Sequence, residues 1–208
     1  TQAVRKGYFE KADGGGCDME IGTRFSGGDI NFTVTERIAP GQYSLTAETA
    51  GTVGNEYVGT LFPIDYVPEL AAARLADILI PGEDEESDDA LRARYFESLK
   101  SQAFGGNIAD YKNKVELLPG VGAVKVFPVW NGGGTVKIVL VDSEWGVPSS
   151  ELVKQVQEAI DPVNTQGTGV GLAPIGHVVT VAGVTGSKID VSFNLTFEGG
   201  ASWTSTQD

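Results

Sequence analysis

The stretch AVKVFPVWNGGGTVKIVLVD, residues 123–142, contains two runs rich in β-branched residues on either side of a glycine-rich turn. Residues 123–130 and 135–142 are typical of strands, because Val and Ile pack well on a half-buried pleated surface. Residues 131–134, NGGG, supply the left-handed backbone conformations that a tight turn requires. The sequence therefore predicts an antiparallel hairpin.

A helix and two more strands are predicted after this hairpin. Residues 147–161, VPSSELVKQVQEAID, place apolar side chains at helical spacing, and Ser149 or Ser150 is suited to cap the first turn. The segments GHVVTVAG, residues 176–183, and KIDVSFNLTF, residues 188–197, have the composition of strands. In the second of them apolar and polar residues alternate strictly, which is typical of a half-buried strand.

An acidic run precedes the hairpin and leads into a helical pattern. Residues 83–89, EDEESDD, hold six carboxylates in seven positions. Ser87 is placed to cap the helix, and Asp88 and Asp89 fall in its first turn, where the helix dipole favours negative charge. Asp88 also stands four residues before Arg92, a spacing that favours an ion pair. The buried stripe predicted for this helix consists of Leu91, Tyr95, Phe96, Leu99 and Ala103.

A second helix is predicted directly after the glycines at 105 and 106. Asn107 is its expected N-cap, and LPGVG, residues 118–122, ends it. The two helices should form a helical hairpin or corner. The stripe that the second helix is expected to bury consists of Ile108, Tyr111, Val115 and Leu118.

The first sixty residues predict a small β-rich meander. DINFTVTERI, residues 29–38, and QYSLTAET, residues 42–49, alternate apolar and polar side chains. CDMEIGTRFSGGD, residues 17–29, resembles a further strand, and residues 51–68 form a connection interrupted by Gly and Pro.

These patterns predict an α+β fold with two domains. The first is a β-rich domain with its connection, residues 1–80. The second, residues 81–208, combines two helices with a mostly antiparallel sheet, on which one further helix packs.

Composition narrows the classes of partner. A net charge of −13 repels a phosphate backbone, so nucleic acid is not expected as a partner. No apolar run is long enough to span a bilayer and residues 1–11 lack a signal-peptide pattern, so no membrane association is expected. One cysteine allows neither an intrachain disulfide nor a cysteine-only zinc site.

No catalytic, cofactor-binding or metal-binding residues are predicted. His177 is the only histidine, and a structural hydrogen bond is favoured for it over catalysis. Cys17 has no basic neighbour in the sequence, so an inert thiol is expected. GTGVG, residues 167–171, lacks the Lys and the helix of a phosphate loop, and residues 83–86 lack the glycine of a calcium loop.

Three tryptophans, Trp130, Trp145 and Trp203, are candidates for protein contacts. Trp130 ends a predicted strand and is expected to pack in the core, whereas Trp145 lies in the turn DSEWGVP and is the better candidate for an exposed contact.

Taken in order, several short motifs resemble the baseplate J-like family of contractile phage tails, and within it the XkdT-type proteins of PBSX-like prophages. Each motif is weak alone, but their order over residues 81–181 is fairly specific. The matching residues are Gly82, Glu86 to Asp88, Leu91, Arg92, Arg94, Gly105 to Asn107, Asp110, Tyr111, Pro119 to Val121, Trp130 with the glycines up to Gly134, Ala173, Pro174, Gly176 and His177. Upstream, Ile21 to Phe25, Gly51, Gly54 and Asn55 extend the resemblance.

The resemblance implies a structural virion protein with no enzymatic activity and no cofactor. It implies a wedge position in the tail baseplate, with assembly in the bacterial cytoplasm. It also implies oligomeric contacts with other baseplate and tail proteins, namely wedge, hub and sheath-proximal components. Family members are longer, and a first residue of Thr suggests a fragment. Charge reversal of residues 83–86 is then expected to impair assembly while leaving the fold intact.

Two alternatives remain at this point. A tail-associated peptidoglycan hydrolase would cleave cell-wall glycan, and a host-binding module would bind cells directly. The scarcity of His and Cys disfavours the hydrolase, and the resemblance to a wedge rather than a fibre disfavours the adhesin.

Overall fold

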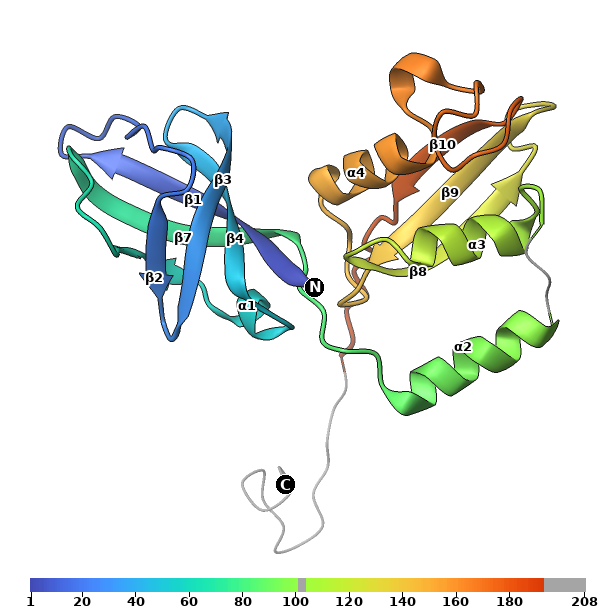
Figure 1. The fold of residues 1–208 in the computed structure, drawn as a ribbon, viewed down its shortest axis with the longest axis horizontal. Coiled ribbons are helices and arrows are strands. Elements are labelled where there is room, and N and C mark those ends of the chain that lie inside the picture. Colours follow the sequence, from blue (N-terminus) through green and yellow to red (C-terminus); the bar gives the residue numbers. More distant parts are fainter. Residues whose placement is uncertain (101–103, 193–208) are drawn as a thin grey trace, which may run out of the picture.

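The computed structural model describes residues 1–100 and 104–192, which form two lobes with separate cores (Figure 1). The first, called the barrel lobe, spans residues 2–80. Its strands, with one short helix, are β1 (Gln2–Lys11), β2 (Arg24–Gly27), β3 (Ile30–Ala39), β4 (Gln42–Ala50), α1 (Val53–Glu56), β5 (Gly59–Thr60), β6 (Phe62–Pro63) and β7 (Leu70–Ile80).

The sheet of the barrel lobe curls so far that its two edge strands are joined by a single residue. The strand order is β5-β7-β1-β4-β3-β2-β6, and only Leu61 separates the edge strands β5 and β6 in sequence. Apolar residues from β1, β3, β4 and β7 point inward, with Phe9 in ring contact with Phe25 and Tyr43. Curling in this way leaves only short edges exposed to unwanted strand pairing.

The second lobe, called the α/β lobe, has a three-stranded sheet with two helices on one face (Figure 1). Its elements are α3 (Ile108–Glu116), β8 (Val121–Pro128), β9 (Thr135–Asp142), α4 (Ser150–Ile160), the 3-10 turn η1 (Val163–Thr165) and β10 (Val178–Gly183). β8 and β9 form the predicted antiparallel hairpin, and β10 runs parallel to β9 after the α4 crossover.

The α+β fold class is confirmed. The domain boundary at Pro81 stays a prediction. The strand predicted at residues 188–197 is not formed over residues 188–192, where Ile189 and Val191 are exposed and have no strand partner among the described residues. The remainder of that segment lies outside the described part.

Three predicted helix starts match the structure. Ser87 Oγ accepts a hydrogen bond from Ala90 N at 3.3 Å, Asn107 Oδ1 from Asp110 N at 2.8 Å, and Ser149 Oγ from Leu152 N at 3.1 Å. Each bond satisfies a backbone donor that the helix itself leaves unpaired.

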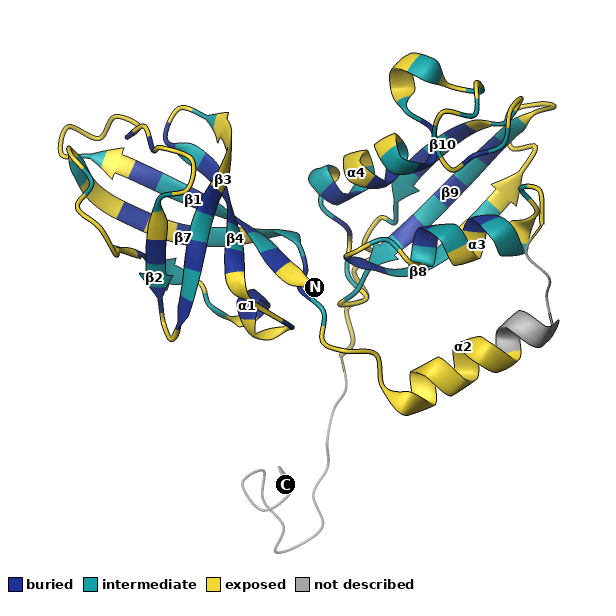
Figure 2. Cartoon of the chain, in the orientation of Figure 1, coloured by how far each residue is buried: buried dark blue, intermediate teal, exposed yellow. Residues whose placement is uncertain are grey.

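The first predicted helix, α2 (Asp88–Lys100), forms, but the prediction that it buries an apolar stripe is wrong for Leu91, Tyr95 and Phe96. The side chain of Leu99, and Ala103, lie outside the described residues. Every residue from Asp88 to Phe96 is exposed, and Figure 2 shows the helix standing apart from both cores. The expected pair of Asp88 with Arg92 is replaced by Asp89 with Arg92, at 3.3 Å.

Candidate assembly surface

The segment that joins the two lobes, residues 79–86, is held by side-chain hydrogen bonds from both sides. The Asn55 amide bonds both backbone groups of Gly82: Nδ2 donates to Gly82 O at 3.0 Å, and Gly82 N donates to Oδ1 at 2.8 Å. From the α/β lobe, Ser149 Oγ donates to Leu79 O. Position 82 accepts only glycine, because a Cβ there would stand 2.4 Å from Gly51 O.

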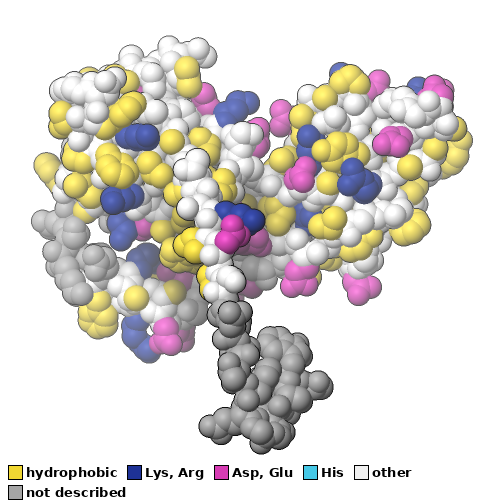
Figure 3. Space-filling view, turned by 180° about the vertical axis from the view of Figure 1, so that it is seen from behind, with side chains coloured by type: hydrophobic (Ala, Val, Ile, Leu, Met, Phe, Trp, Pro, Cys, Tyr) yellow, Lys and Arg dark blue, Asp and Glu magenta, His cyan; other side chains and the backbone are white. Residues whose placement is uncertain are grey.

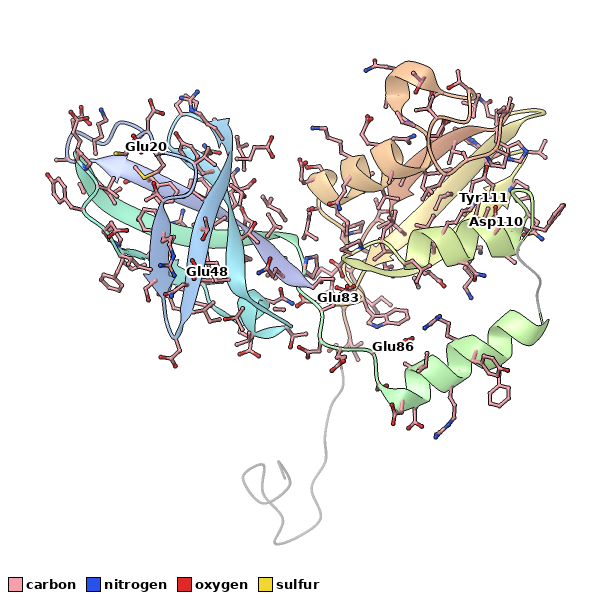
Figure 4. All side chains as sticks on the ribbon, in the orientation of Figure 1. Glu20, Glu48, Glu83, Glu86, Asp110 and Tyr111 are labelled. Carbon is pink, nitrogen blue, oxygen red and sulfur yellow. The ribbon has the colours of Figure 1, made fainter. Side chains whose placement is uncertain are left out.

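Besides Asp89, three acids of the run are bound within the chain, and Figure 4 labels two of them, Glu83 and Glu86. Glu83 Oε1 accepts a hydrogen bond from Gly120 N at 3.2 Å, which connects the junction to the α/β lobe. Asp84 accepts from Thr52 N at 2.9 Å and Thr52 Oγ1 at 2.8 Å.

Glu86 forms a bidentate ion pair with Arg94: Nε donates to Oε1 at 3.0 Å, and Nη2 donates to Oε2 at 2.9 Å. This pair holds the pKa of Glu86 below its usual value. Reversal of residues 83–86 would remove these contacts, so we now expect it to disturb the junction between the lobes as well as assembly. Glu85 and Asp88 have no hydrogen bond or ion pair to another described residue.

Asp84 makes the junction sensitive to acid. Two hydrogen bonds from Thr52 lower the pKa of Asp84. Because the folded pKa is depressed, this carboxylate stabilises the junction fully above its unfolded pKa of about 3.9, and this contribution is lost as pH falls through the lower, folded pKa. We expect the protection of the Thr52 amide against exchange, relative to an unstructured amide at the same pH, to fall in Asp84→Asn at pH 7 and in the wild type as pH falls through the depressed pKa of Asp84. Hydrogen exchange measured by NMR checks this, and Glu85→Gln is the matched control that should leave the amide unchanged.

A groove of about 850 Å³ separates α2 from α3. Ala90 and Ala93 of α2 line one wall, and Ile108 and Leu117 at the two ends of α3 line the other. Ile108 was expected in the core but is 55% exposed, and Leu117 is 71% exposed. Burial raises the pKa of Glu116 in the same groove, although Lys112 acts in the opposite direction.

The face of α2 turned away from this groove carries both apolar and charged side chains. Since successive helix residues are about 100° apart, this face holds Leu91, Tyr95 and Phe96 together with Asp88 and Arg92. Leu91 is 47% exposed and Phe96 55% exposed. Residues 88–96 of α2 are all exposed, so they lack the core packing against other described residues that usually stabilises a helix of 13 residues, which is marginal in water on its own.

Of the three candidate tryptophans, Trp203 lies outside the described residues, and the other two lie at the surface. Trp145 is 74% exposed, as expected for a residue that contacts another protein. Its φ is positive, at 62°, which is an uncommon backbone conformation for a residue with a large side chain. Trp130 is 45% exposed, so its assignment to the core was wrong. Helices cover one face of the sheet only, and Trp130 has Lys137 Nζ 5.2 Å from its ring centroid.

The two residues considered for chemistry occupy structural positions. His177 Nδ1 and the hydroxyl of buried Tyr111 are hydrogen-bonded at 2.8 Å, and burial raises the pKa of Tyr111 to about 12. Cys17 is 2% exposed, and burial raises the pKa of its thiol. In the part of the chain that the structure covers, no three His, Cys, Asp or Glu side chains are grouped to hold a metal ion. No helix in that part is long and apolar enough to cross a membrane.

Sequence reasoning missed the groove and the outward lysines of the sheet. Helical spacing predicted that Ile108 is buried, because periodicity alone does not show how much of the helix packs against the neighbouring sheet. The alternation of Lys125 with Val124 and Val126 was the available signal that one side of β8 faces solvent.

Comparison with known proteins gives this surface its context. Residues 103–183 match the family described as the Baseplate J-like central domain. The Bacillus subtilis (strain 168) protein YqbT is 42% identical over 194 residues, and the phage-like element PBSX protein XkdT of the same strain is 40% identical over 194 residues. Each alignment covers 92% of this chain and 53% of the relative.

A more distant relative is the baseplate protein gp47 of Escherichia phage Mu, 30% identical over 179 residues, which cover 78% of this chain and 48% of gp47. The chain thus spans about half the length of these curated relatives. Together the matches confirm the resemblance to the baseplate J-like family that the ordered motifs indicate.

Proposed function

We propose that the chain is a structural component of a contractile-tail baseplate, in the position of a wedge protein, and that it acts by binding other tail proteins. It carries out no catalysis in this role and has no cofactor. Its place is the tail baseplate of the virion, assembled in the bacterial host cytoplasm.

One observation carries this proposal. The exposed helix α2 and the groove beside α3 present apolar side chains to solvent, in a chain whose two cores are complete without them. Exposed apolar patches of this kind mark protein interaction sites. The similarity to a phage baseplate protein and to a PBSX element protein supplies the setting.

Incorporation into particles tests the proposal. The chain is produced with an affinity tag in a bacterium that makes contractile tails, and intact particles are isolated. We expect the chain in the particles, with tail proteins co-purifying. Ile108→Asp with Leu117→Asp should lower that recovery roughly tenfold, because interface centres lined by apolar anchors dominate binding.

A matched control separates loss of contact from loss of fold. Ile21→Asp with Ile64→Asp introduces the same charges at residues that are 60% and 43% exposed on the barrel lobe, and should leave recovery unchanged. Circular dichroism verifies that all variants are folded. Absence of the chain from particles, or release of glycan fragments from cell walls by the purified chain, would contradict the proposed function.

A further inference from the structure

No helix of the described residues covers the face of the α/β sheet opposite α3 and α4, and this face, called the open face, carries positive charge. Its outward positions in β8, β9 and β10 hold two lysines and no carboxylate. They are Ala123, Lys125, Phe127, Thr135, Lys137, Val139, Val141, Val178, Thr180 and Ala182. In Figure 3, which views the molecule from behind, hydrophobic and Lys or Arg side chains lie together over this lobe.

The two lysines stand beside aromatic rings rather than acids. Lys125 Nζ is 5.2 Å from the ring centroid of Phe127, and Lys137 Nζ is 5.2 Å from that of Trp130. Neither lysine forms an ion pair within the described residues. In a chain with a net charge of −13, this apolar and cationic face is suited to an acidic partner.

The chain itself carries an element of the complementary kind. The outward half of α2 presents Leu91, Tyr95 and Phe96 next to Asp88 and Arg92. The charge of Arg92 is paired with Asp89 at 3.3 Å, and the acidic Glu85 lies just before the helix. Glu85 and Asp88 are the two acids of the run that no described side chain or backbone group pairs. The acids and the lysines that have no ion-pair partner among the described residues thus lie on different surfaces of the molecule.

We propose that α2 of one copy packs across the open face of a second copy. Leu91 and Phe96 would lie against Phe127 and Val139, and Glu85 and Asp88 would approach Lys125 and Lys137. A helix laid on the uncovered face of a sheet is a standard packing of layers. The lengths agree, since 13 helical residues span about 20 Å and an eight-residue strand about 26 Å.

This contact is head to tail, because different surfaces of the two copies meet. Each added copy presents a free α2 and a free sheet face, so the contact propagates or closes into a ring. The inference deepens the proposed assembly role and rests on it.

Charge exchange tests the pairing in the purified chain. Sedimentation velocity over roughly 1 to 200 μM should show association of the wild type that increases with concentration. Lys125→Glu with Lys137→Glu should weaken association roughly tenfold or more, and so should Glu85→Lys with Asp88→Lys. Combining all four substitutions should restore it to within about threefold of wild type, because attraction returns with reversed signs.

A control of equal charge change identifies the surface. Lys6→Glu with Arg74→Glu reverses two cations that lie over the Tyr8 ring of the barrel lobe, at 5.1 and 4.9 Å, and should leave association unchanged. Failure of the four-residue exchange to restore association would overturn the pairing.

Cysteine cross-linking tests the direction of the contact. A mixture of Leu91→Cys and Val139→Cys chains should form covalent dimers under oxidation, and chains carrying both substitutions should form a ladder of larger species. Native Cys17 is buried and stays out of the reaction. Dimers formed by Leu91→Cys alone would overturn the proposal, since α2 would then meet α2. A chain that is monomeric at about 200 μM but present in tail particles would overturn this contact and leave the proposed function standing.

Discussion

Arg5→Met is expected to lower the free energy of unfolding of the barrel lobe by about 3 kcal/mol, because each buried polar group left unpaired costs about 1–3 kcal/mol. Arg5 is fully buried in β1. Its Nη1 donates to Gly54 O at 2.8 Å and Asn55 O at 2.9 Å, and its Nη2 donates to Ala76 O at 2.6 Å. Methionine fills similar space but leaves these three carbonyls without their donor.

Burial lowers the pKa of Arg5, and the carboxylates of Glu144 and Asp77 oppose this effect. The guanidinium nevertheless remains charged at neutral pH, since its ordinary pKa exceeds about 12. Its role is therefore to connect α1 and β7 through backbone carbonyls rather than through a buried acid.

The measurement for Arg5→Met is urea unfolding followed by circular dichroism, with tryptophan emission recorded in parallel. Trp130 and Trp145 both lie in the second half of the chain, so their signal should be little changed. Lys6→Met is the matched control: its amine lies over the Tyr8 ring outside the core, and a change within about 0.5 kcal/mol is expected. Equal stability of the two variants would contradict the assigned role of Arg5.

Asp161→Ala should destabilise the α/β lobe by about 3 kcal/mol, because two backbone donors lose a charged acceptor. Asp161 follows α4 and is 1% exposed. Its carboxylate accepts from Gly167 N at 3.1 Å and Val179 N at 2.8 Å, joining the η1 loop to the outer edge of β10.

Tryptophan emission during urea unfolding should report this loss directly, since Trp130 and Trp145 belong to the affected half. Glu158→Ala removes an exposed acid from the same helix and should change stability by no more than about 0.5 kcal/mol. If both variants unfold together, Asp161 does not hold the β10 edge.

The outer edge of β10 is closed by side chains. Gln157 Oε1 accepts from Val181 N at 2.8 Å, and Gln157 and Gln166 each donate to Val179 O, at 3.1 and 2.9 Å. With Asp161, these groups occupy backbone positions that another strand would otherwise use. Association through this edge is thereby disfavoured, which leaves the broad face of the sheet for contacts.

Sequence reasoning identified the elements whose local pattern agrees with their packing. The hairpin of β8 and β9 and the helices α3 and α4 were predicted from residues 107–161 because β-branched runs, a glycine turn and capping residues agree there. The strands β1 and β7 were missed. In β1 two inward positions hold Arg5 and Gly7, and a Cβ on Gly7 would stand 2.4 Å from Leu45, so the usual apolar signal is absent.

β7 was missed for a different reason. Its sequence, LAAARLADILI, consists of residues that favour helices, and pairing with β1 and β5 overrides that preference. Burial of α2 was overestimated because an amphipathic stripe shows that a helix has an apolar side, not that this chain supplies its cover. The sequence therefore predicted the helix α2 and its capped, acidic start correctly, but not the contacts that they make.

The central position of β1 governs how the barrel lobe is made. β1 lies between β4 and β7, with Val4 opposite Ile80, so the first strand obtains its second neighbour only after about eighty residues have been synthesised. Until then the nascent chain displays β1 with an unpaired side. Contacts so distant in sequence slow folding relative to the local hairpin of β8 and β9. Until residue 80 has left the ribosome, chaperone binding to the nascent chain therefore competes with closure of the barrel-lobe sheet.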